Sequence, residues 1–168
     1  THYSSIFTPD SEAKIKDYIN RAIELGHNTY FTTEHGYMGS IFEANDLCLA
    51  NNIKCIAAME GYIVPEPTQK DNSNYHIMLI PTSDKARKKL NKASSRANRE
   101  GYYYKPRLFL EDLLNFKEDE LYITNACVGG LLRDDISTNQ IAIPLIKHFK
   151  QHFLVEVQSH NTTKQKEM

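Results

Sequence analysis

The chain has 168 residues with 20 basic and 21 acidic side chains, and its formal net charge of −1 excludes a polyanion binder that acts through overall charge. This length predicts one domain, spanning 1–168. Three cysteines without CxxC spacing argue against a disulfide framework and favour a reducing, cytoplasmic compartment. No apolar run approaches the ~20 residues that a membrane span requires, so we expect no membrane partner.

Helix-like and strand-like segments alternate along the chain, and a polar surface loop is expected at 66–74. In chain order, the predicted elements are helix 12–25, strands 28–33, 53–59 and 75–80 with helix 39–51 between the first two, helix 84–99, a short helix 109–115, strand 121–126, a helix near 139–151 and strand 153–157. Strands separated by helices predict βα units and an α/β fold. The strands are nearly continuous apolar runs, which favours an incomplete barrel with mostly parallel strands; a doubly wound open sheet is the alternative.

Metal-ligand residue types follow four of the predicted strands. Glu34 and His35 follow one strand, and Glu60, Cys127 and His160 each follow another. In a parallel barrel the carboxyl ends of all strands open on one face, so these side chains are expected to converge there. His76 instead stands at the start of its own strand, which leaves its placement open.

Carboxylate, imidazole and thiolate ligands together suit Zn²⁺ or Mn²⁺, with Fe²⁺ as a third candidate, better than Mg²⁺ or Ca²⁺. Several such ligands on one face would suit a cluster of two or three ions, which can hold both the attacking water and the leaving oxygen of a phosphoester. For any one of these residues taken alone, a structural role is the commoner outcome, since a lone Cys is usually a small core residue.

A basic segment between Lys85 and Arg107 contains nine Lys or Arg residues and a single acid, Glu100, with three consecutive tyrosines inside it. Basic residues interleaved with aromatics suit nucleic acid. The candidate contacts are Lys88, Lys92, Arg96, Arg99, Lys105 and Arg107. The alternative is a solvated helix face balanced by the acids that follow it, among them Glu111, Asp112 and Glu120.

Several motifs, in order along the chain, resemble those of PHP domains (polymerase and histidinol phosphatase type). Thr33-Glu34-His35-Gly36 resembles T-D-H-G, Met59-Glu60-Gly61-Tyr62 resembles G-x-E-x-Y, and Asn125-Ala126-Cys127-Val128-Gly129-Gly130 resembles S-G-C-L-G-G. Gly101-Tyr102-Tyr103-Tyr104-Lys105-Pro106-Arg107 is similar to the G-F-Y-x-K-P-R of bacterial and phage DNA polymerase III alpha subunits. The resemblance covers essentially the whole chain.

This resemblance implies a distorted (βα)₇ barrel with a site for up to three metal ions. By match, its ligands would be Glu34, His35, Glu60, His76, Cys127 and His160. Two departures stand out. Glu34 replaces the family's Asp, and its extra methylene shifts the carboxylate by about 1 Å, enough to impair a site held to ~0.5 Å. The family's opening HxH would lie before Thr1 and its closing D-x-H after Met168, so we expect the chain to be cut at both ends and to hold fewer ions or none.

Three functions follow from the resemblance. The first is a metal-dependent 3′–5′ exonuclease or phosphoesterase module of a DNA-directed DNA polymerase, a nucleotidyltransferase whose partners are DNA and the other replisome subunits. The second is a catalytically inactive scaffold within the same polymerase. The third is a stand-alone phosphatase of the histidinol phosphatase type, against which the block ending in Lys105-Pro106-Arg107 argues.

Overall fold

One long strand, β2 (Lys54–Ile63), organises the sheet in the computed structural model, which describes residues 12–159. Along one edge, β2 pairs in parallel with β1 (Thr29–His35) and then, beyond the end of β1, with β5 (Lys105–Leu108). Along its other edge, the second half of β2 pairs antiparallel with β3 (Tyr75–Pro81). The segment of β2 around Glu60 therefore has a neighbour on both sides.

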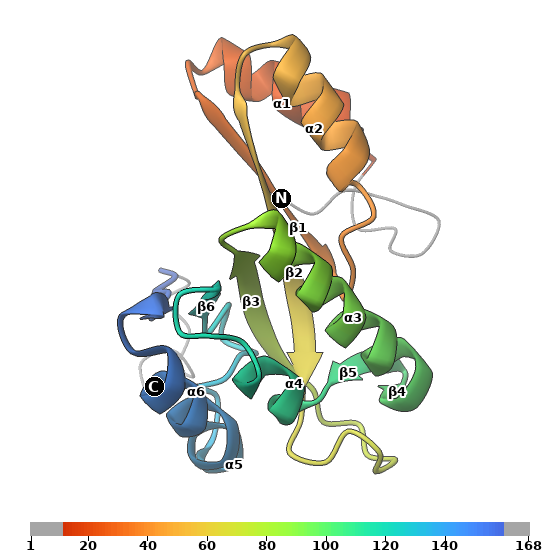
Figure 1. Cartoon of the computed structure of the whole chain (residues 1–168), viewed down its shortest axis with the longest axis vertical. Coiled ribbons are helices and arrows are strands. Elements are labelled where there is room, and N and C mark those ends of the chain that lie inside the picture. Colours follow the sequence, from red (N-terminus) through yellow and green to blue (C-terminus); the bar gives the residue numbers. More distant parts are fainter. Residues whose placement is uncertain (1–11, 160–168) are drawn as a thin grey trace.

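The remaining elements complete a mixed sheet of order β4-β5-β2-β3-β6-β7, with β1 added beside β2 (Figure 1). They are α1 (Ile15–Glu24), α2 (Ile41–Ala50), α3 (Asp84–Glu100), β4 (Tyr102–Tyr103), α4 (Leu110–Leu114), β6 (Leu121–Thr124), α5 (Asp135–Ser137), a π-helical turn (Thr138–Ala142), α6 (Ile143–Phe149), a 3₁₀ turn (Lys150–His152) and β7 (Phe153–Leu154). Among residues 12–159, no helix is both long and apolar enough to cross a membrane.

Helix α3 forms where the sequence predicts it, for local reasons. The hydroxyl of Ser83 caps its first turn by accepting a hydrogen bond from the amide of Ala86 at 3.1 Å. Its small and apolar residues recur every three or four positions, which aligns them on one face. That face is buried and consists of Ala86, Leu90, Ala93 and Ala97 together with Ser94.

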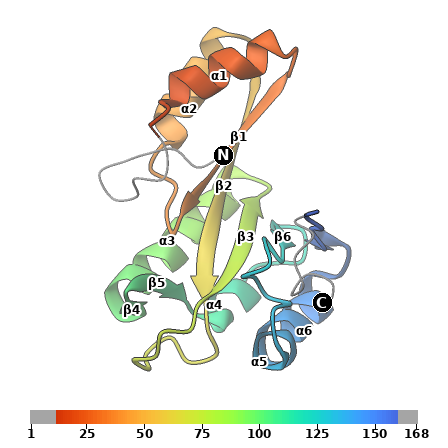
Figure 2. The same ribbon diagram turned by 180° about the vertical axis from the view of Figure 1, so that it is seen from behind.

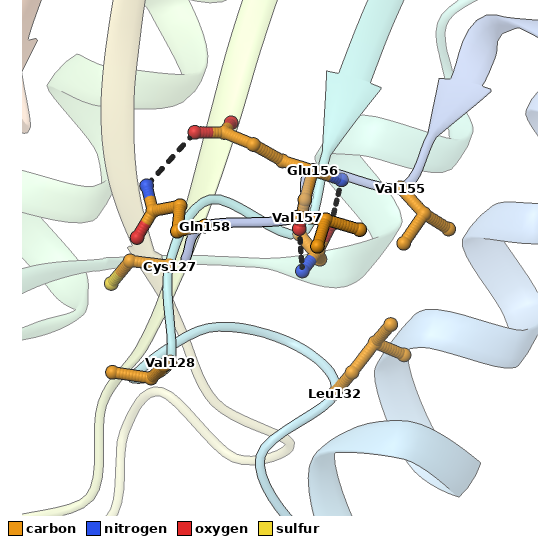
Figure 3. Close-up of a pocket in the computed structure, with 8 residues that line it drawn as sticks. Cys127, Val128, Leu132, Val155, Glu156, Val157 and Gln158 are labelled. Atoms are coloured by element: carbon orange, nitrogen blue, oxygen red, sulfur yellow. Dashed lines mark hydrogen bonds between the residues drawn. The ribbon is translucent and has the colours of Figure 1, made fainter. Parts of the chain in front are cut away.

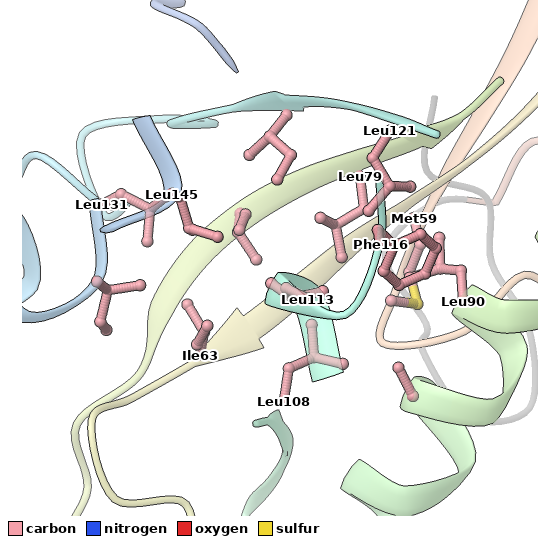
Figure 4. Close-up of a cluster of buried hydrophobic side chains, with 14 of the residues drawn as sticks. Met59, Ile63, Leu79, Leu90, Leu108, Leu113, Phe116, Leu121, Leu131 and Leu145 are labelled. Atoms are coloured by element: carbon pink, nitrogen blue, oxygen red, sulfur yellow. The ribbon is translucent and has the colours of Figure 1, made fainter. Parts of the chain in front are cut away.

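Two hydrophobic clusters flank the length of β2. The smaller one lies between α1, α2 and the first half of the β1–β2 pair, and includes Ile15, Ile19 and Cys48. The larger one fills the space between the sheet and α3, α4 and α6, and includes Met59, Ile63, Leu79, Leu90, Leu113 and Phe116 (Figure 4). The connection between the two halves of the molecule therefore runs through β1 and β2 (Figure 1).

The two faces of the sheet differ in chemistry because side chains alternate along a strand. Met59 and Ile63 of β2, with Ile77 and Leu79 of β3, point toward the larger cluster. Figure 2 views the opposite face, with β2 and β3 in front of α3 and α4. The residues next to these on each strand, such as Glu60 after Met59 and His76 before Ile77, therefore point to the face away from α3.

The expectation of mostly parallel strands is wrong for the described residues. Three strand pairs are parallel, β1–β2, β2–β5 and β6–β7, and three are antiparallel, β2–β3, β3–β6 and β4–β5. The cause is the connection from β2 to β3, residues 64–74, which contains no helix that could carry the chain back for a parallel pairing. Within residues 12–159, the fold is α/β with a mixed sheet, and no strand pairing closes it into a barrel.

Candidate metal centre

Three predicted ligands lie together on the face of the sheet that points away from α3. His35 ends β1 directly opposite Glu60 of β2, and His76 of β3 stands opposite Tyr62, two residues beyond Glu60. The register therefore places all four side chains on one face. His76 Nδ1 lies 2.7 Å and His35 Nδ1 lies 3.6 Å from the same oxygen, Oε1 of Glu60.

The antiparallel direction of β3 explains why His76 joins this group although it begins its strand. A reversed strand brings its start to the level where its neighbour ends, and His76 is accordingly next to the carboxyl-terminal half of β2. Tyr62, buried in the same wall, contacts both imidazole rings, with ring centroids 5.9 Å from His35 and 5.3 Å from His76.

Cys127 approaches the group from the loop after β6. Its sulfur lies 3.5 Å from His76 Nδ1 and 3.4 Å from the amide of Gly129. The Gly129 carbonyl in turn accepts a hydrogen bond from the His76 amide at 3.2 Å, so the loop is fastened to β3. A Cβ atom at Gly130 would lie only 1.7 Å from the Asn125 carbonyl oxygen, which explains why glycine is needed in this turn.

Glu34 is not brought to the other predicted ligands. It precedes His35 in β1, so its side chain points to the opposite face of the sheet. It is 1% exposed, and its Oε2 accepts hydrogen bonds from the Ser40 amide at 2.8 Å and the Ser40 hydroxyl at 2.6 Å. Glu34 thus fastens the start of α2 to β1. The sixth predicted ligand, His160, lies outside the described residues.

The donor set suits a transition metal, although the donors now contact one another. One carboxylate, two imidazoles and one thiol fit Zn²⁺, Mn²⁺ or Fe²⁺. No three His, Cys, Asp or Glu side chains within residues 12–159 are arranged to hold an ion as they stand. The 2.7 Å between Glu60 and His76 is a hydrogen-bonding distance, and binding of an ion would replace that contact.

An open cavity of about 190 Å³ adjoins the Cys127 side of this centre (Figure 3). Its walls are mostly apolar and include Val128, Leu132 and Val155. Glu156 is held at its edge, because its amide donates to Asn125 Oδ1 at 2.6 Å. Cys127 therefore belongs both to the lining of this cavity and to the group around His76.

The predicted nucleic-acid residues fall into two groups. Arg96 is neutralised by Glu100, Glu111 and Asp112 at 2.7–3.0 Å, as the solvated-face alternative expects. Arg107 is 2% exposed, which argues against the DNA contact predicted for it. Its guanidinium instead donates to main-chain carbonyls, those of Gly101, Pro67, Gln69 and Asp71.

The other four remain candidates for nucleic-acid contact because they are exposed. Lys88 pairs with Asp84 at 2.8 Å on the outer face of α3, where Lys92 and Arg99 are also exposed. Lys105 lies elsewhere, in β5, with its Nζ 5.0 Å from the centre of the Tyr62 ring. Lys105 and His35 line the same cavity, and no other predicted cation among the described residues does so.

The sequence did not single out Tyr62, Tyr102 or Tyr104 as site residues. With His35 and Lys105, these tyrosines line a second cavity of about 400 Å³. Tyr62 could have been found by strand alternation, since it lies two residues after Glu60 and must share its face. Tyr102 and Tyr104 depend on the β4–β5 hairpin, which the sequence pattern did not reveal.

Comparisons with known proteins identify the family of the sequence. A family model described as the PHP domain matches residues 1–160. DNA polymerase III alpha subunits are similar to the chain: that of Aquifex aeolicus is 31% identical over 93% of this chain and 15% of its own length. Those of Borreliella burgdorferi and Deinococcus radiodurans are 29% and 27% identical over 90% and 99% of this chain, and 14% of their own lengths.

Solved structures give weaker likenesses. A protein described as a metal-dependent phosphoesterase from Bifidobacterium adolescentis has a TM-score of 0.41 at 12% identity, over 52% of this chain and 29% of its own. An amidohydrolase from Chromobacterium violaceum has a TM-score of 0.39 at 20% identity, over 58% and 34%. The chain spans about 15% of the length of the curated relatives it matches. Because the family model covers nearly all of the sequence, the chain belongs to the PHP domain family.

Proposed function

We propose that the chain is the PHP portion of a cytoplasmic DNA polymerase III alpha subunit and carries a metal-dependent phosphoesterase centre that acts on the 3′ end of DNA. The observation that carries the proposal is the convergence of His35, Glu60, His76 and Cys127 from four different segments. The similarity of the chain to DNA polymerase III alpha subunits favours this parent over a stand-alone phosphatase. DNA and other replisome subunits are the partners this parent implies.

The chain's own residues have definable tasks in such a centre. His35, His76 and Cys127 would hold Zn²⁺, Mn²⁺ or Fe²⁺ together with Glu60, and His160 would join them. A bound divalent ion supplies Lewis-acid chemistry that polarises a phosphodiester. Tyr62 packs against both imidazoles and fixes their ring planes, which supports precise placement of their nitrogens. The Gly129 amide donates to the Cys127 sulfur at 3.4 Å, which holds that sulfur beside His76.

A non-catalytic scaffold is the second candidate, favoured by two observations. Glu60 and His76 hydrogen-bond each other, and no three potential ligands within residues 12–159 are poised around an ion. A carboxylate–imidazole pair of this kind also braces two strands without any metal. The two candidates differ in whether the folded chain takes up metal.

The deciding experiment measures metal uptake by equilibrium dialysis against Zn²⁺ and Mn²⁺ with elemental analysis. We expect at least one equivalent in the unmodified chain and at least a tenfold weaker affinity in Cys127→Ala and His76→Ala. Cys55→Ala is the matched control, because Cys55 belongs to the other half of β2. Circular dichroism verifies folding of each variant. A folded chain that binds no metal, or binds it equally in Cys127→Ala, favours the scaffold.

Activity is tested separately with a 3′-labelled single-stranded oligonucleotide. The phosphoesterase proposal expects Mn²⁺- or Zn²⁺-dependent release of the terminal nucleotide, abolished by EDTA and by His76→Ala. The scaffold expects no release with either ion. Turnover of small phosphate esters without any release from DNA would instead favour a phosphatase.

A further inference from the structure

The cavity of about 400 Å³ beside the metal centre has not been assigned a role by the proposed function. It shares two residues with that centre, His35 and Tyr62, so a molecule inside it would contact the predicted ligand wall. Its outer wall comes from the β4–β5 hairpin, which follows α3. A volume of this size falls within the range of small-molecule sites and suits one nucleotide rather than a duplex.

The outer wall presents two aromatic rings to solvent. Tyr102 is 61% exposed and Tyr104 is 74% exposed, although both line the same cavity. Tyr104 occupies the tip of the hairpin, between the paired residues Tyr103 and Lys105. Exposed aromatic rings flanking a concavity offer a flat surface on which a base can stack.

Tyr104 also adopts a backbone conformation that non-glycine residues rarely take, with φ at +58°. Such a conformation costs ~1–3 kcal/mol and persists only where the surroundings impose it. Here the buried Arg107 fixes the base of the hairpin. It donates a hydrogen bond to the Gly101 carbonyl at 3.1 Å, and its Cζ lies 5.5 Å from the Tyr103 ring centre. The backbone of the hairpin is thus held at its base, which reduces the entropy lost when a ligand stacks on the tyrosines.

The charge of the cavity points to an anionic ligand. Lys105 provides a cation whose Nζ lies 5.0 Å from the Tyr62 ring, and no acidic side chain among the described residues lines the cavity. One lysine can neutralise one phosphate, while the tyrosines offer stacking to one base. A flat ring joined to a single negative charge is the chemistry of one nucleotide.

We infer that this cavity binds the terminal nucleotide of single-stranded DNA by stacking on Tyr102 and Tyr104 and pairing its phosphate with Lys105, so that the scissile bond meets the wall formed by His35. The inference rests on the proposed function for the meaning of that position, but binding itself requires no metal. It assigns Tyr102, Tyr104 and Lys105 a role in holding the substrate.

The absence of tryptophan from the chain permits a direct test. Tyr104→Trp places a single tryptophan, which can be excited apart from the tyrosines, at the proposed stacking surface, and Tyr122→Trp places one at the exposed position of β6 as a matched control. A (dT)₁₀ oligonucleotide is titrated into each variant in EDTA, which prevents cleavage. We expect saturable quenching only in Tyr104→Trp, because the indole stacks on a base. No quenching there, or equal quenching in both variants, would overturn the inference.

A second measurement identifies the residues that bind. Fluorescence anisotropy of labelled (dT)₁₀ in EDTA should show about fivefold or greater weakening in Tyr102→Ala and Lys105→Ala, because each removes a stack or a phosphate contact. Lys16→Ala, at an exposed position of α1, is the matched lysine control and should leave affinity unchanged, and Lys92→Ala on α3 tests the basic surface separately. Equal losses in Lys92→Ala and Lys105→Ala would mean diffuse binding to the basic surface and would refute the cavity.

The two proposals fail separately. His76→Ala should lose metal but retain binding of (dT)₁₀, since His76 does not line this cavity. A chain that binds (dT)₁₀ through Lys105 but takes up no metal contradicts only the metal centre. An unmodified chain that takes up metal but binds (dT)₁₀ no better than Lys105→Ala contradicts only the cavity. A circular (dT)₁₀ that competes as well as the linear one would exclude a site for the terminal nucleotide.

Discussion

His76 Nδ1 and Glu60 Oε1 lie 2.7 Å apart across the antiparallel pair formed by β3 and β2. The same imidazole nitrogen is 3.5 Å from the Cys127 sulfur, so His76 links the sheet to the loop after β6. Three chemically different donors thus meet at one atom. The reactivity of the Cys127 thiol should therefore report the binding of a metal ion at this centre.

Thiol alkylation should distinguish the three cysteines. Burial raises the pKa of Cys55 to about 12 and also raises the pKa of Cys48, so both thiols stay protonated at pH 8. Iodoacetamide should therefore modify the partly exposed Cys127 first, and Zn²⁺ should protect it. Peptide mapping by mass spectrometry measures each rate. Faster modification of Cys55 than of Cys127, or no protection by Zn²⁺, would contradict this prediction.

The hydrogen bonds between Glu34 and Ser40 give a second prediction. Ser40→Ala removes the 2.6 Å hydroxyl contact to the buried Glu34 side chain, and it should cost ~1–3 kcal/mol of unfolding free energy because the acceptor cannot reach water. Urea denaturation measures the loss. Ser95→Ala, an exposed serine on α3, is the control and should change stability by less than ~0.5 kcal/mol. Comparable losses in both variants would contradict the role of Glu34 in fastening the start of α2 to β1.

Glu34 also illustrates how far the sequence could lead. The motif Thr33-Glu34-His35-Gly36 correctly marks the end of β1, but two adjacent strand residues cannot share a face. Strand alternation could have separated Glu34 from His35. It could not have revealed that Ser40 provides the partner, because that contact depends on how the chain enters α2.

The direction of β3 depended on information that no local pattern contains. Helices such as α3 were predictable because their buried faces repeat within a few residues. The helix-free connection at 64–74 is shorter than the dozen or more residues that a parallel crossover requires, but this decides the direction only once β2 and β3 are known to be neighbours, which no local pattern shows. That single choice decides whether His76 reaches Glu60. The same loop also explains why Arg107, predicted to contact DNA, is buried against its carbonyls.

Arg107 should tolerate even a conservative change poorly. Arg107→Lys keeps the positive charge but removes the planar donors that satisfy the carbonyls of Pro67 and Gln69 at 2.7 Å, so we expect a loss of ~2–4 kcal/mol. Thermal unfolding measures it. Arg99→Lys, on the exposed face of α3, should be nearly neutral. If Arg107→Lys were equally neutral, the guanidinium would not be what fastens the loop at 64–74 to the hairpin.

The pairing of Glu120 with α3 should make stability depend on pH in the acidic range. Hydrogen bonds from the Lys117 amide and from Lys89 Nζ, both 2.9 Å long, lower the pKa of Glu120 below its usual value of 4.5. A lowered folded-state pKa means that the unfolded chain binds the proton more readily. The stabilisation is therefore complete above about pH 5 and disappears as the pH falls through the folded-state pKa. Since the pair is partly exposed to solvent, its contribution should be only ~0.5–1 kcal/mol.

Glu120→Gln should lower the unfolding free energy at pH 7 by this amount, and the difference from the unmodified chain should shrink toward pH 3. Glu66→Gln, at an exposed position, controls for the general effect of removing a carboxylate. Urea titrations at pH 7, 5 and 3 measure both differences, and a Glu120→Gln effect that grows toward pH 3 would contradict the assigned direction of the shift.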